Sequence, residues 1–148
     1  MTEADLDAVV YIEYSVTDFP WPKTLFADSL NVGHRCQVLD MDYGIGGFTV
    51  VSSVADEATL LNIAVAPQCQ GEGLGKLLLQ ECLDAIQQQQ ITQCFLEVRS
   101  SNRRAINLYH RTGFISVGER RNYYPAAAGR EDAIVMKWQL EKTSNECS

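Results

Sequence analysis

Three glycines at alternate positions, Gly71, Gly73 and Gly75, stand at the start of a leucine-rich stretch. Glycine inside a helix costs about 0.5–1 kcal/mol relative to alanine, so bare backbone must be needed at this point. The first amides of a helix lack partners within the helix, and the helix dipole favours an anion beside them. A strand, this turn and an amphipathic helix therefore predict a phosphate-binding turn, although glycines kept only for close packing would give the same pattern.

Two well-known phosphate loops do not match this turn. The Walker A motif needs Gly-x4-Gly-Lys followed by Ser or Thr. Here Gly75-Lys76 is followed by Leu77, and Gln70 stands where the first glycine belongs. The dinucleotide fingerprint GxGxxG has Lys76 in place of its third glycine. The turn belongs to neither class.

Glu97 is the most unusual charged residue of the chain, because it lies in the middle of the apolar stretch CFLEVR. In a strand it shares a face with Phe95 and Arg99. Glutamate is rarely buried without a partner, and burial would raise its pKa toward the range that suits a general base. An ion pair with Arg99 or another cation at a sheet edge is the alternative.

The hydrophobic pattern predicts the elements that must position these residues. Helices are expected at about 2–14, 22–30, 74–86 and 102–113, and strands at 35–41, 46–53, 58–66, 92–100, 114–122 and 132–140, with a loop YYPAAAGRE between the last two. Thr2 with Asp5 resembles a capping box, Asn102 is a plausible N-cap, and Gly113 a helix stop. This order predicts an α/β fold with helices packed on a mixed sheet.

Length and composition favour one soluble domain over residues 1–148, with a flexible tail at 141–148. No apolar run approaches the ~20 residues of a membrane span. The first residues, MTEADLDAVV, lack the basic region of a signal peptide. We therefore expect a cytoplasmic protein with no membrane partner.

Charge and cysteine content exclude further classes. The net charge of −7 argues against direct nucleic-acid binding and is compatible with a cationic partner such as a basic peptide, although solubility alone would explain it equally well. The five cysteines form no CxxC pair and no cluster with histidine. We expect reduced thiols, no disulfides and no metal site.

Several motifs together resemble the GNAT superfamily of N-acetyltransferases. The acetyl-CoA signature of this superfamily, Arg/Gln-x-x-Gly-x-Gly/Ala, is similar to Gln70-x-x-Gly73-x-Gly75, which follows Val65-Ala66-Pro67. A later motif of the superfamily is similar to the stretch LEVRSSNRRAINLYHRTGF. The segments RRNYYP, GREDAIVM, FPW and DEATLLNIAV resemble the bacterial members that acetylate ribosomal proteins. The resemblance covers about residues 3–138. It implies the GNAT fold, a mixed central sheet of about six to seven strands flanked by about four helices.

The resemblance implies acetyl-CoA as co-substrate. Its pantetheine would run along the strand at Ile63, Ala64 and Val65, and an amide near Val65 would hold the carbonyl oxygen of the thioester. Asn102 would contact the cofactor as well as cap its helix. The pyrophosphate would lie on the amides of Gly71, Glu72, Gly73, Leu74, Gly75 and Lys76.

The same resemblance assigns roles on the acceptor side. Glu97 would accept the proton of the amine, and Tyr109 would donate one to the leaving thiolate, because a phenol with a pKa of about 10 stays protonated when a thiol of about 8.5 ionises. Core packing is the alternative for Tyr109. Tyr123 and Tyr124 would wall the peptide slot, and Glu131 would attract a basic second residue, although all three would also serve as ordinary turn residues.

The implied acceptor is the N-terminal alanine of a small-subunit ribosomal protein, number eighteen, with its basic N-terminal segment as partner. An α-amino group has a pKa of about 7.7–8.0, against about 10.4 for lysine, so a modest base can deprotonate it. Two alternatives remain. One is acetylation of lysine side chains or small amines, and the other is an acyl-CoA-binding regulatory module without turnover.

The chain departs from the superfamily pattern at five positions. Ala66 replaces an acidic residue, Cys69 replaces an aromatic one, and Glu72 puts a negative charge into the turn. Arg103 and Arg104 replace small residues and are either a solvated helix face or contacts to a cofactor phosphate. None of these changes removes a proposed catalytic group.

Overall fold

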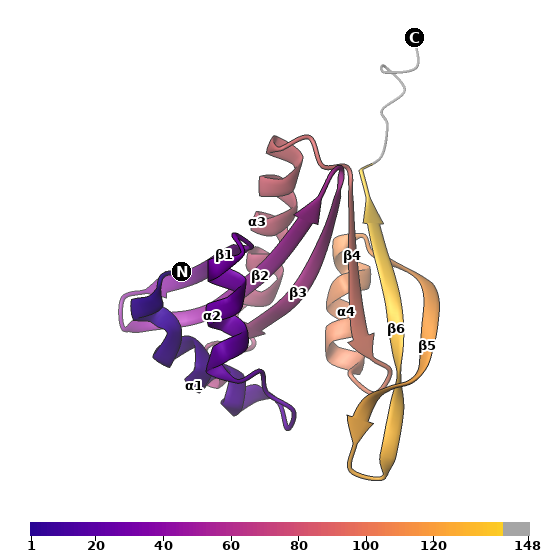
Figure 1. Ribbon diagram of the computed structural model, residues 1–148, viewed down its shortest axis with the longest axis horizontal. Coiled ribbons are helices and arrows are strands. Elements are labelled where there is room, and N and C mark those ends of the chain that lie inside the picture. The colour runs from indigo at the N-terminus through magenta and orange to yellow at the C-terminus, as the bar shows by residue number, and fades with distance from the viewer. Residues whose placement is uncertain (141–148) are drawn as a thin grey trace.

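A six-stranded mixed sheet with the order β1-β2-β3-β4-β6-β5 forms the centre of the computed structural model, which describes residues 1–140 (Figure 1). Only β3 and β4 pair in parallel. The elements are α1 (Leu6–Val16), α2 (Lys23–Asn31), β1 (Arg35–Met41), β2 (Gly44–Val54), β3 (Glu57–Val65), α3 (Leu74–Gln88), β4 (Gln93–Arg99), α4 (Arg103–Thr112), β5 (Ile115–Ala126) and β6 (Gly129–Gln139). Single 3-10 turns lie at Glu3–Asp5 and Pro67–Cys69. The expected fold and element order are confirmed.

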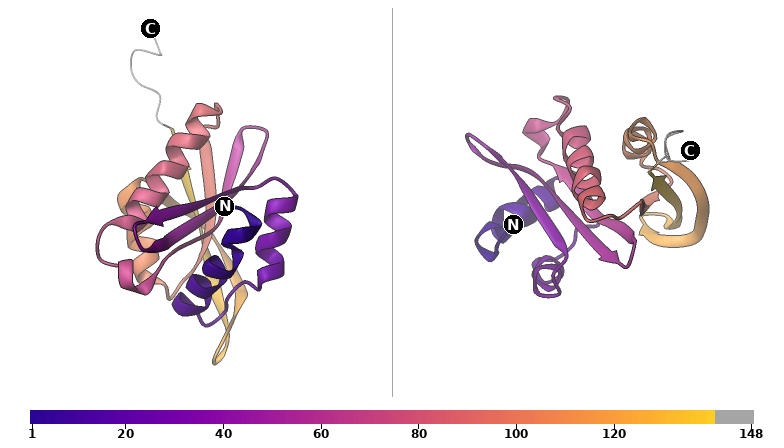
Figure 2. Two further views of the ribbon diagram at one scale, coloured as in Figure 1. Left: turned by 90° about the vertical axis from the view of Figure 1, so that its left-hand side faces the viewer. Right: turned by 90° about the horizontal axis from the view of Figure 1, so that it is seen from above.

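The N-terminal helices α1 and α2 cover one face of the sheet (Figure 2). The predicted capping box is present, with the Thr2 amide 2.8 Å from Asp5 Oδ2, and it opens a 3-10 turn that leads into α1. The apolar sides of the helices bury Val9 and Phe26 completely, together with Phe48 of β2. This packing fixes the segment that joins α1 and α2 beside the sheet.

Helices α3 and α4 cover the opposite face (Figure 2). Asn102 caps α4 by accepting a hydrogen bond from the Ala105 amide at 3.2 Å, and Gly113 ends the helix with φ of 112°. Against these helices β4 buries alternate residues, Cys94, Leu96 and Val98. The intervening residues Phe95, Glu97 and Arg99 therefore face the other side, as the strand alternation predicts.

The C-terminal hairpin is longer than the sequence predicts. The expected loop YYPAAAGRE is wrong, because β5 runs to Ala126 and β6 begins at Gly129. Gly129 adopts φ of 111°, which permits a tight turn between the strands. Pro125 is tolerated because β5 is an edge strand and needs no amide on its outer side. The hairpin thus carries Tyr124 and Glu131 as paired strand residues rather than as loop residues.

Other expectations concern what the chain lacks. No helix between residues 1 and 140 is long and apolar enough to cross a membrane. Within the same range, no three His, Cys, Asp or Glu side chains are grouped to hold a metal ion. The cysteines in the described part, Cys36, Cys69, Cys82 and Cys94, are buried and not disulfide-bonded. The predicted flexible tail lies outside the described residues.

Candidate active site

A gap between β3 and β4 is the central feature of the site. The two strands pair only at Glu57–Thr59 with Gln93–Phe95, at the beginning of both. Beyond these residues the strands diverge, as Figure 1 shows. The second half of β3 keeps its pairing with β2 but leaves its other edge without a strand partner. A parallel sheet that opens in this way exposes main-chain groups to a ligand.

The main chain of β3 points into this gap at two of the predicted positions. The Ala66 amide donates to the Gly46 carbonyl at 2.8 Å, which makes Gly47–Val65 a pair without mutual hydrogen bonds. The amide and carbonyl of Val65 therefore point away from β2, as do those of Ile63 two residues earlier. The Val65 carbonyl accepts from Gln70 Nε2 at 3.1 Å, while its amide faces the gap. The main chain of Ala64 instead forms its hydrogen bonds with β2, so Ala64 only separates the two residues whose main chain faces the gap.

The glycine turn lies directly after β3 and begins α3. Gly71 and Gly73 have φ of 84° and 79°, in the left-handed region that favours glycine, and a side chain at either would meet no other atom within 4 Å. Gly75 differs, because a Cβ there would lie 3.3 Å from Leu108 of α4. Two glycines are thus needed for backbone conformation and the third for helix packing. The packing alternative therefore holds for Gly75, and phosphate binding by the turn stays a prediction.

The amides of this turn are available to an anion. Within residues 1–140, the amides of residues 71–76 donate to no protein acceptor, and α3 has no side-chain cap. Glu72 and Lys76 are exposed, so the Glu72 side chain does not fill the turn. Arg103 and Arg104 of α4 are both exposed, and Arg104 donates a hydrogen bond to Gln70 Oε1 at 3.0 Å, which links α4 to the turn. The free amides at the dipole end of α3 fit the diphosphate of a coenzyme.

Glu97 lies on the far side of the gap and is ion-paired. Its Oε1 is 2.7 Å from Arg120 Nε, and the Glu97 side chain is 26% exposed. The alternative read from the sequence, an ion pair, is therefore present, with Arg120 of β5 in place of Arg99. Tyr123 is the second partner, since hydrogen bonding to the Glu97 carboxylate raises the pKa of Tyr123. Glu97 is thus a partly exposed carboxylate that water can reach.

The hairpin places two tyrosines together at this carboxylate. The rings of Tyr123 and Tyr124 meet edge to face with centroids 5.0 Å apart. Burial, with the Glu97 charge as a second cause, raises the pKa of Tyr124 to about 12. Asn122, just before them, has φ of 52° and its amide bonds to Asp132 Oδ1 at 2.9 Å. This irregular point coincides with the register shift of β5 between Arg120 and Tyr124, just before the two tyrosines.

Tyr109 reaches the site from α4. It is 7% exposed, and its ring centroid lies 5.9 Å from that of Phe114. Burial raises the pKa of Tyr109, and nearby Tyr124 adds to the effect. The phenol is therefore held in its protonated form, so core packing and proton donation are compatible in this residue. Asn102, at the start of the same helix, is a cap, and its cofactor contact stays a prediction.

Glu131 is engaged within the protein. Its Oε1 accepts from Arg99 Nη1 at 3.0 Å and its Oε2 from the Ser101 amide at 3.3 Å. The hydrogen bond from Ser101, followed by the one from Arg99, holds the pKa of Glu131 below its usual value. The predicted contact between Glu131 and a basic substrate residue stays a prediction, and it would require a carboxylate that Arg99 already neutralises.

Two residues at the site have no direct sign in the sequence. Arg120 reaches Glu97 from β5, and Phe19, in the segment between α1 and α2, packs on Arg99 with 4.1 Å between guanidinium carbon and ring centroid. Both contacts cross long sequence separations. The FPW segment that contains Phe19 resembles the bacterial members of the superfamily, but this resemblance does not indicate its contact with Arg99.

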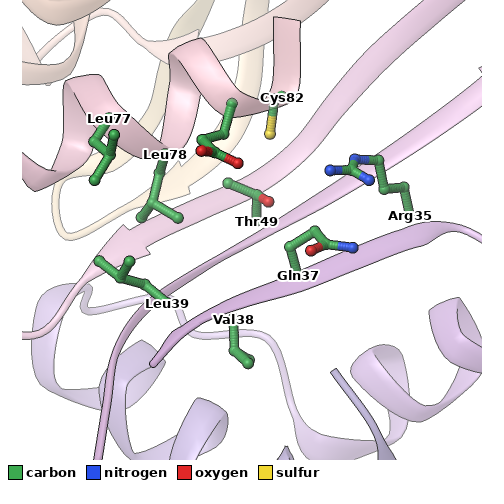
Figure 3. A pocket seen from close by; sticks show the side chains of 9 residues that line it. Arg35, Gln37, Val38, Leu39, Thr49, Leu77, Leu78 and Cys82 are labelled. Carbon is green, nitrogen blue, oxygen red and sulfur yellow. The ribbon is translucent and has the colours of Figure 1, made fainter. Parts of the chain in front are cut away.

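A separate cavity of about 150 Å³ lies between α3 and the strands β1 and β2 (Figure 3). Arg35 of β1 and Cys82 of α3 both line it, and Arg35 Nε is buried with no hydrogen-bond partner in the described part of the chain. The remaining lining residues are Gln37, Val38, Leu39, Thr49, Leu77, Leu78 and Glu81. None of the predicted site residues is among them, so this cavity is distinct from the gap.

Comparison with known proteins agrees with this geometry. The family model described as acetyltransferase (GNAT) family matches residues 7–114. The chain belongs to the GNAT acetyltransferase family. It is 42% identical over 132 residues to the ribosomal protein bS18-alanine N-acetyltransferase of Escherichia coli, with 89% of each chain covered. The protein of that name from Haemophilus influenzae is 39% identical, covering 92% of this chain and 93% of the relative.

The solved structures show the same fold. The crystal structure of the ribosomal-protein-S18-alanine N-acetyltransferase from Escherichia coli superposes with a TM-score of 0.90 at 38% identity, covering 97% of this chain and 93% of the other. This GNAT chain is therefore similar to that enzyme along nearly its whole length.

Proposed function

We propose that this GNAT acetyltransferase moves an acetyl group from acetyl-CoA to the α-amino group of the N-terminal alanine of ribosomal protein bS18. The observation that carries the proposal is the gap between β3 and β4, with free main-chain donors on one side and Glu97, Tyr123 and Tyr124 on the other. The names of the relatives at 39–42% identity support the acceptor. The cytoplasm, where ribosomal proteins are made, is the proposed location.

Main-chain groups would hold the donor. The free edge of β3 at Ile63 and Val65 would pair with the pantetheine, and the amides of residues 71–76 would bind the pyrophosphate. Acetyl-CoA supplies a thioester, whose acetyl carbon bonds to the amine nitrogen while its bond to sulfur breaks. The Val65 amide, which faces the gap, would donate a hydrogen bond to the carbonyl oxygen as negative charge develops there.

Side chains would handle the protons. Glu97, with its carboxylate open to solvent, would take the proton of the α-ammonium group directly or through a water molecule and release it to solvent. Tyr109 would donate its proton to the departing sulfur and recover one as the amine nitrogen loses its second hydrogen. Burial raises the pKa of Tyr109, so it stays protonated until the thiolate forms. One proton in total is released for each ammonium group acetylated.

The acceptor's charge fits the protein. The chain carries a net charge of −7, which favours encounter with a basic N-terminal segment. The α-amino group has a pKa of about 7.7–8.0, so a carboxylate can deprotonate it more readily than a lysine of about 10.4. This difference favours an N-terminus over a lysine side chain. The presence of both Glu97 and Tyr109 supports an enzyme over a binding module without turnover.

The test is acetyl transfer to synthetic peptides. A peptide with the N-terminal sequence of mature bS18 is incubated with the protein and acetyl-CoA, and the site of acetylation is located by tandem mass spectrometry. We expect acetyl on the N-terminal nitrogen only. The matched control is the same peptide with a blocked N-terminus and its lysines free. Acetylation of that control, or of neither peptide, would reject the proposal, and peptides varied at the first two residues would define the acceptor range.

A further inference from the structure

Arg99 lies between two aromatic rings from distant parts of the chain. Its guanidinium carbon is 4.1 Å from the ring centroid of Phe19 and 4.5 Å from that of Tyr124. The side chain is only 19% exposed. A flat guanidinium can stack on a ring with each of its faces, which the ammonium of lysine cannot do. Arg99 therefore joins the segment between α1 and α2 to the β5–β6 hairpin.

Hydrogen bonds fix this arginine in place. Nη1 donates to the Pro125 carbonyl at 2.6 Å and to Glu131 Oε1 at 3.0 Å. Glu131 itself accepts a hydrogen bond from the amide of Ser101, two residues after the end of β4. Both acceptors on Nη1 belong to the hairpin, so the guanidinium position is set from that side. Phe19 then packs on a cation whose place is already determined.

The segment that carries Phe19 is anchored at its other end as well. Glu13 of α1 is buried, and its Oε2 accepts from the Trp21 amide at 2.9 Å and from Asn62 Nδ2 at 3.0 Å. Asn62 belongs to β3, next to the Ile63–Val65 edge. The segment is thus tied to β3 through Glu13 and to β4 through Arg99. These two strands border the gap.

We propose that Arg99 is a positioning residue for the peptide acceptor, holding the Phe19 segment and Tyr124 at a fixed separation across the mouth of the gap. The proposal rests on the proposed function. Tyr124 packs edge to face on Tyr123, and the Glu97 charge contributes to the raised pKa of Tyr124, so loosening Tyr124 from Arg99 should disturb the acceptor side. The donor side is made of main chain in β3 and α3, to which Arg99 makes none of its described contacts. Loss of Arg99 should therefore affect the peptide and spare acetyl-CoA.

The first experiment measures the two KM values separately. In Arg99→Met we expect the KM for the bS18 peptide to rise about tenfold, the size of one lost cation–π interaction at a partly buried site, and in Arg99→Lys we expect a smaller rise, with the KM for acetyl-CoA unchanged in both. Lysine keeps the positive charge beside Glu131 but cannot stack on both rings, so Arg99→Lys should restore only a part of the peptide affinity that Arg99→Met loses. The matched control is Lys137→Met. It removes a cation 5.5 Å from the Phe95 ring on the same strand pair, and both KM values should stay at the wild-type level.

The second experiment is a double-mutant cycle between Arg99→Lys and Phe19→Leu. If Arg99 acts through Phe19, the effects on the peptide KM will be clearly less than additive, whereas independent residues give additive effects. Thermal unfolding of each variant identifies any variant that fails to fold. If Arg99→Met does not fold, the milder pair Arg99→Lys and Phe19→Leu still tests the proposal. Additive effects, or equal rises in both KM values, would overturn the positioning role while leaving the acetyltransferase function intact. A wild-type protein that acetylates no N-terminus would overturn both proposals.

Discussion

The two sides of the gap are built from different parts of the polypeptide. The donor side consists of main-chain groups, namely the free edge of β3 and the amides of residues 71–76. The acceptor side consists of side chains from β4, β5 and β6, with Glu97, Arg99 and Tyr124 as its centre. The first side is formed by neighbours in sequence. The second is assembled from segments up to 80 residues apart, such as Phe19 and Arg99.

This difference explains which departures from the family pattern the chain tolerates. Cys69 and Glu72 lie on the donor side, where the amide rather than the side chain would bind, so their identity matters little there. Cys69 is fully buried and Glu72 is exposed, and neither occupies the turn. On the acceptor side each side chain has a specific partner. Substitutions there should change the chemistry or the peptide affinity, and they provide the strongest tests of the comparison.

Glu97→Gln should have the largest effect. Removing a general base commonly costs about 10²–10⁴-fold in rate. We expect kcat to fall about 100-fold near pH 6, where the α-amino group is protonated, and less above about pH 8, where much of it is free. The rate of thiol release at saturating substrates, measured across pH, checks this. A loss of equal size at every pH would contradict the base role, and the KM for acetyl-CoA should not change.

Tyr109→Phe should reduce kcat by a similar or slightly smaller factor, about 10²-fold, because the sulfur would have to take its proton from water. Burial raises the pKa of Tyr109, so the phenol stays protonated, and the wild-type rate should show no decline from this group below about pH 10. Phenylalanine preserves the contact with Phe114, so the unfolding temperature should change little. A fully active Tyr109→Phe variant would leave only the packing role.

Gly73→Ala tests the donor side and has a built-in control. A non-glycine residue in the left-handed region costs about 1–2 kcal/mol, so the turn would shift and the KM for acetyl-CoA should rise roughly tenfold. Gly33 has nearly the same φ, 83° against 79°, and equally free surroundings, but lies between α2 and β1. Gly33→Ala should lose similar stability without the change in KM. Equal KM values for the two variants would argue against a phosphate site at residues 71–76.

The smallest effects concern two carboxylates with opposite pKa shifts. Burial raises the pKa of Glu13, so its contribution to stability is present below about pH 4 and is lost as the pH rises through its folded value. Bonds to Ser101 and Arg99 lower the pKa of Glu131, so its contribution is present above about pH 4 and is lost as the pH falls through its folded value. Relative to wild type, Glu13→Gln should gain a few degrees in unfolding temperature as the pH rises to neutrality, and Glu131→Gln should lose a few. Parallel curves for both variants would contradict these shifts.

Local patterns predicted most of the fold and the donor side. The stripe on α3, the Asn102 cap and the Gly113 stop each depend on residues within a few positions, and the structure shows all of them. The glycine turn follows the same logic. Close packing, the alternative that the sequence left open, applies at Gly75, where the neighbour is Leu108 on another helix. Phosphate binding by the turn stays a prediction.

The acceptor side was harder to predict because its contacts join distant segments. Reading YYPAAAGRE as a loop hid the pairing of Tyr124 with Glu131 and the register that brings Arg120 beside Glu97. Glu131 was predicted to face the substrate, but nothing near it in sequence indicated that Arg99 would take its carboxylate. Strand alternation placed Glu97 and Arg99 on one face but could not identify their partners.

Helix α4 has a consequence for the timing of the reaction. One ten-residue rod touches the glycine turn twice, through Arg104 on Gln70 and Leu108 against Gly75, and carries Tyr109 one residue further along. If the coenzyme binds as proposed, a displacement of the turn on its entry or departure would be passed along this helix to the phenol. Loading of the donor and alignment of the group that would protonate its sulfur would then be coupled through one helix.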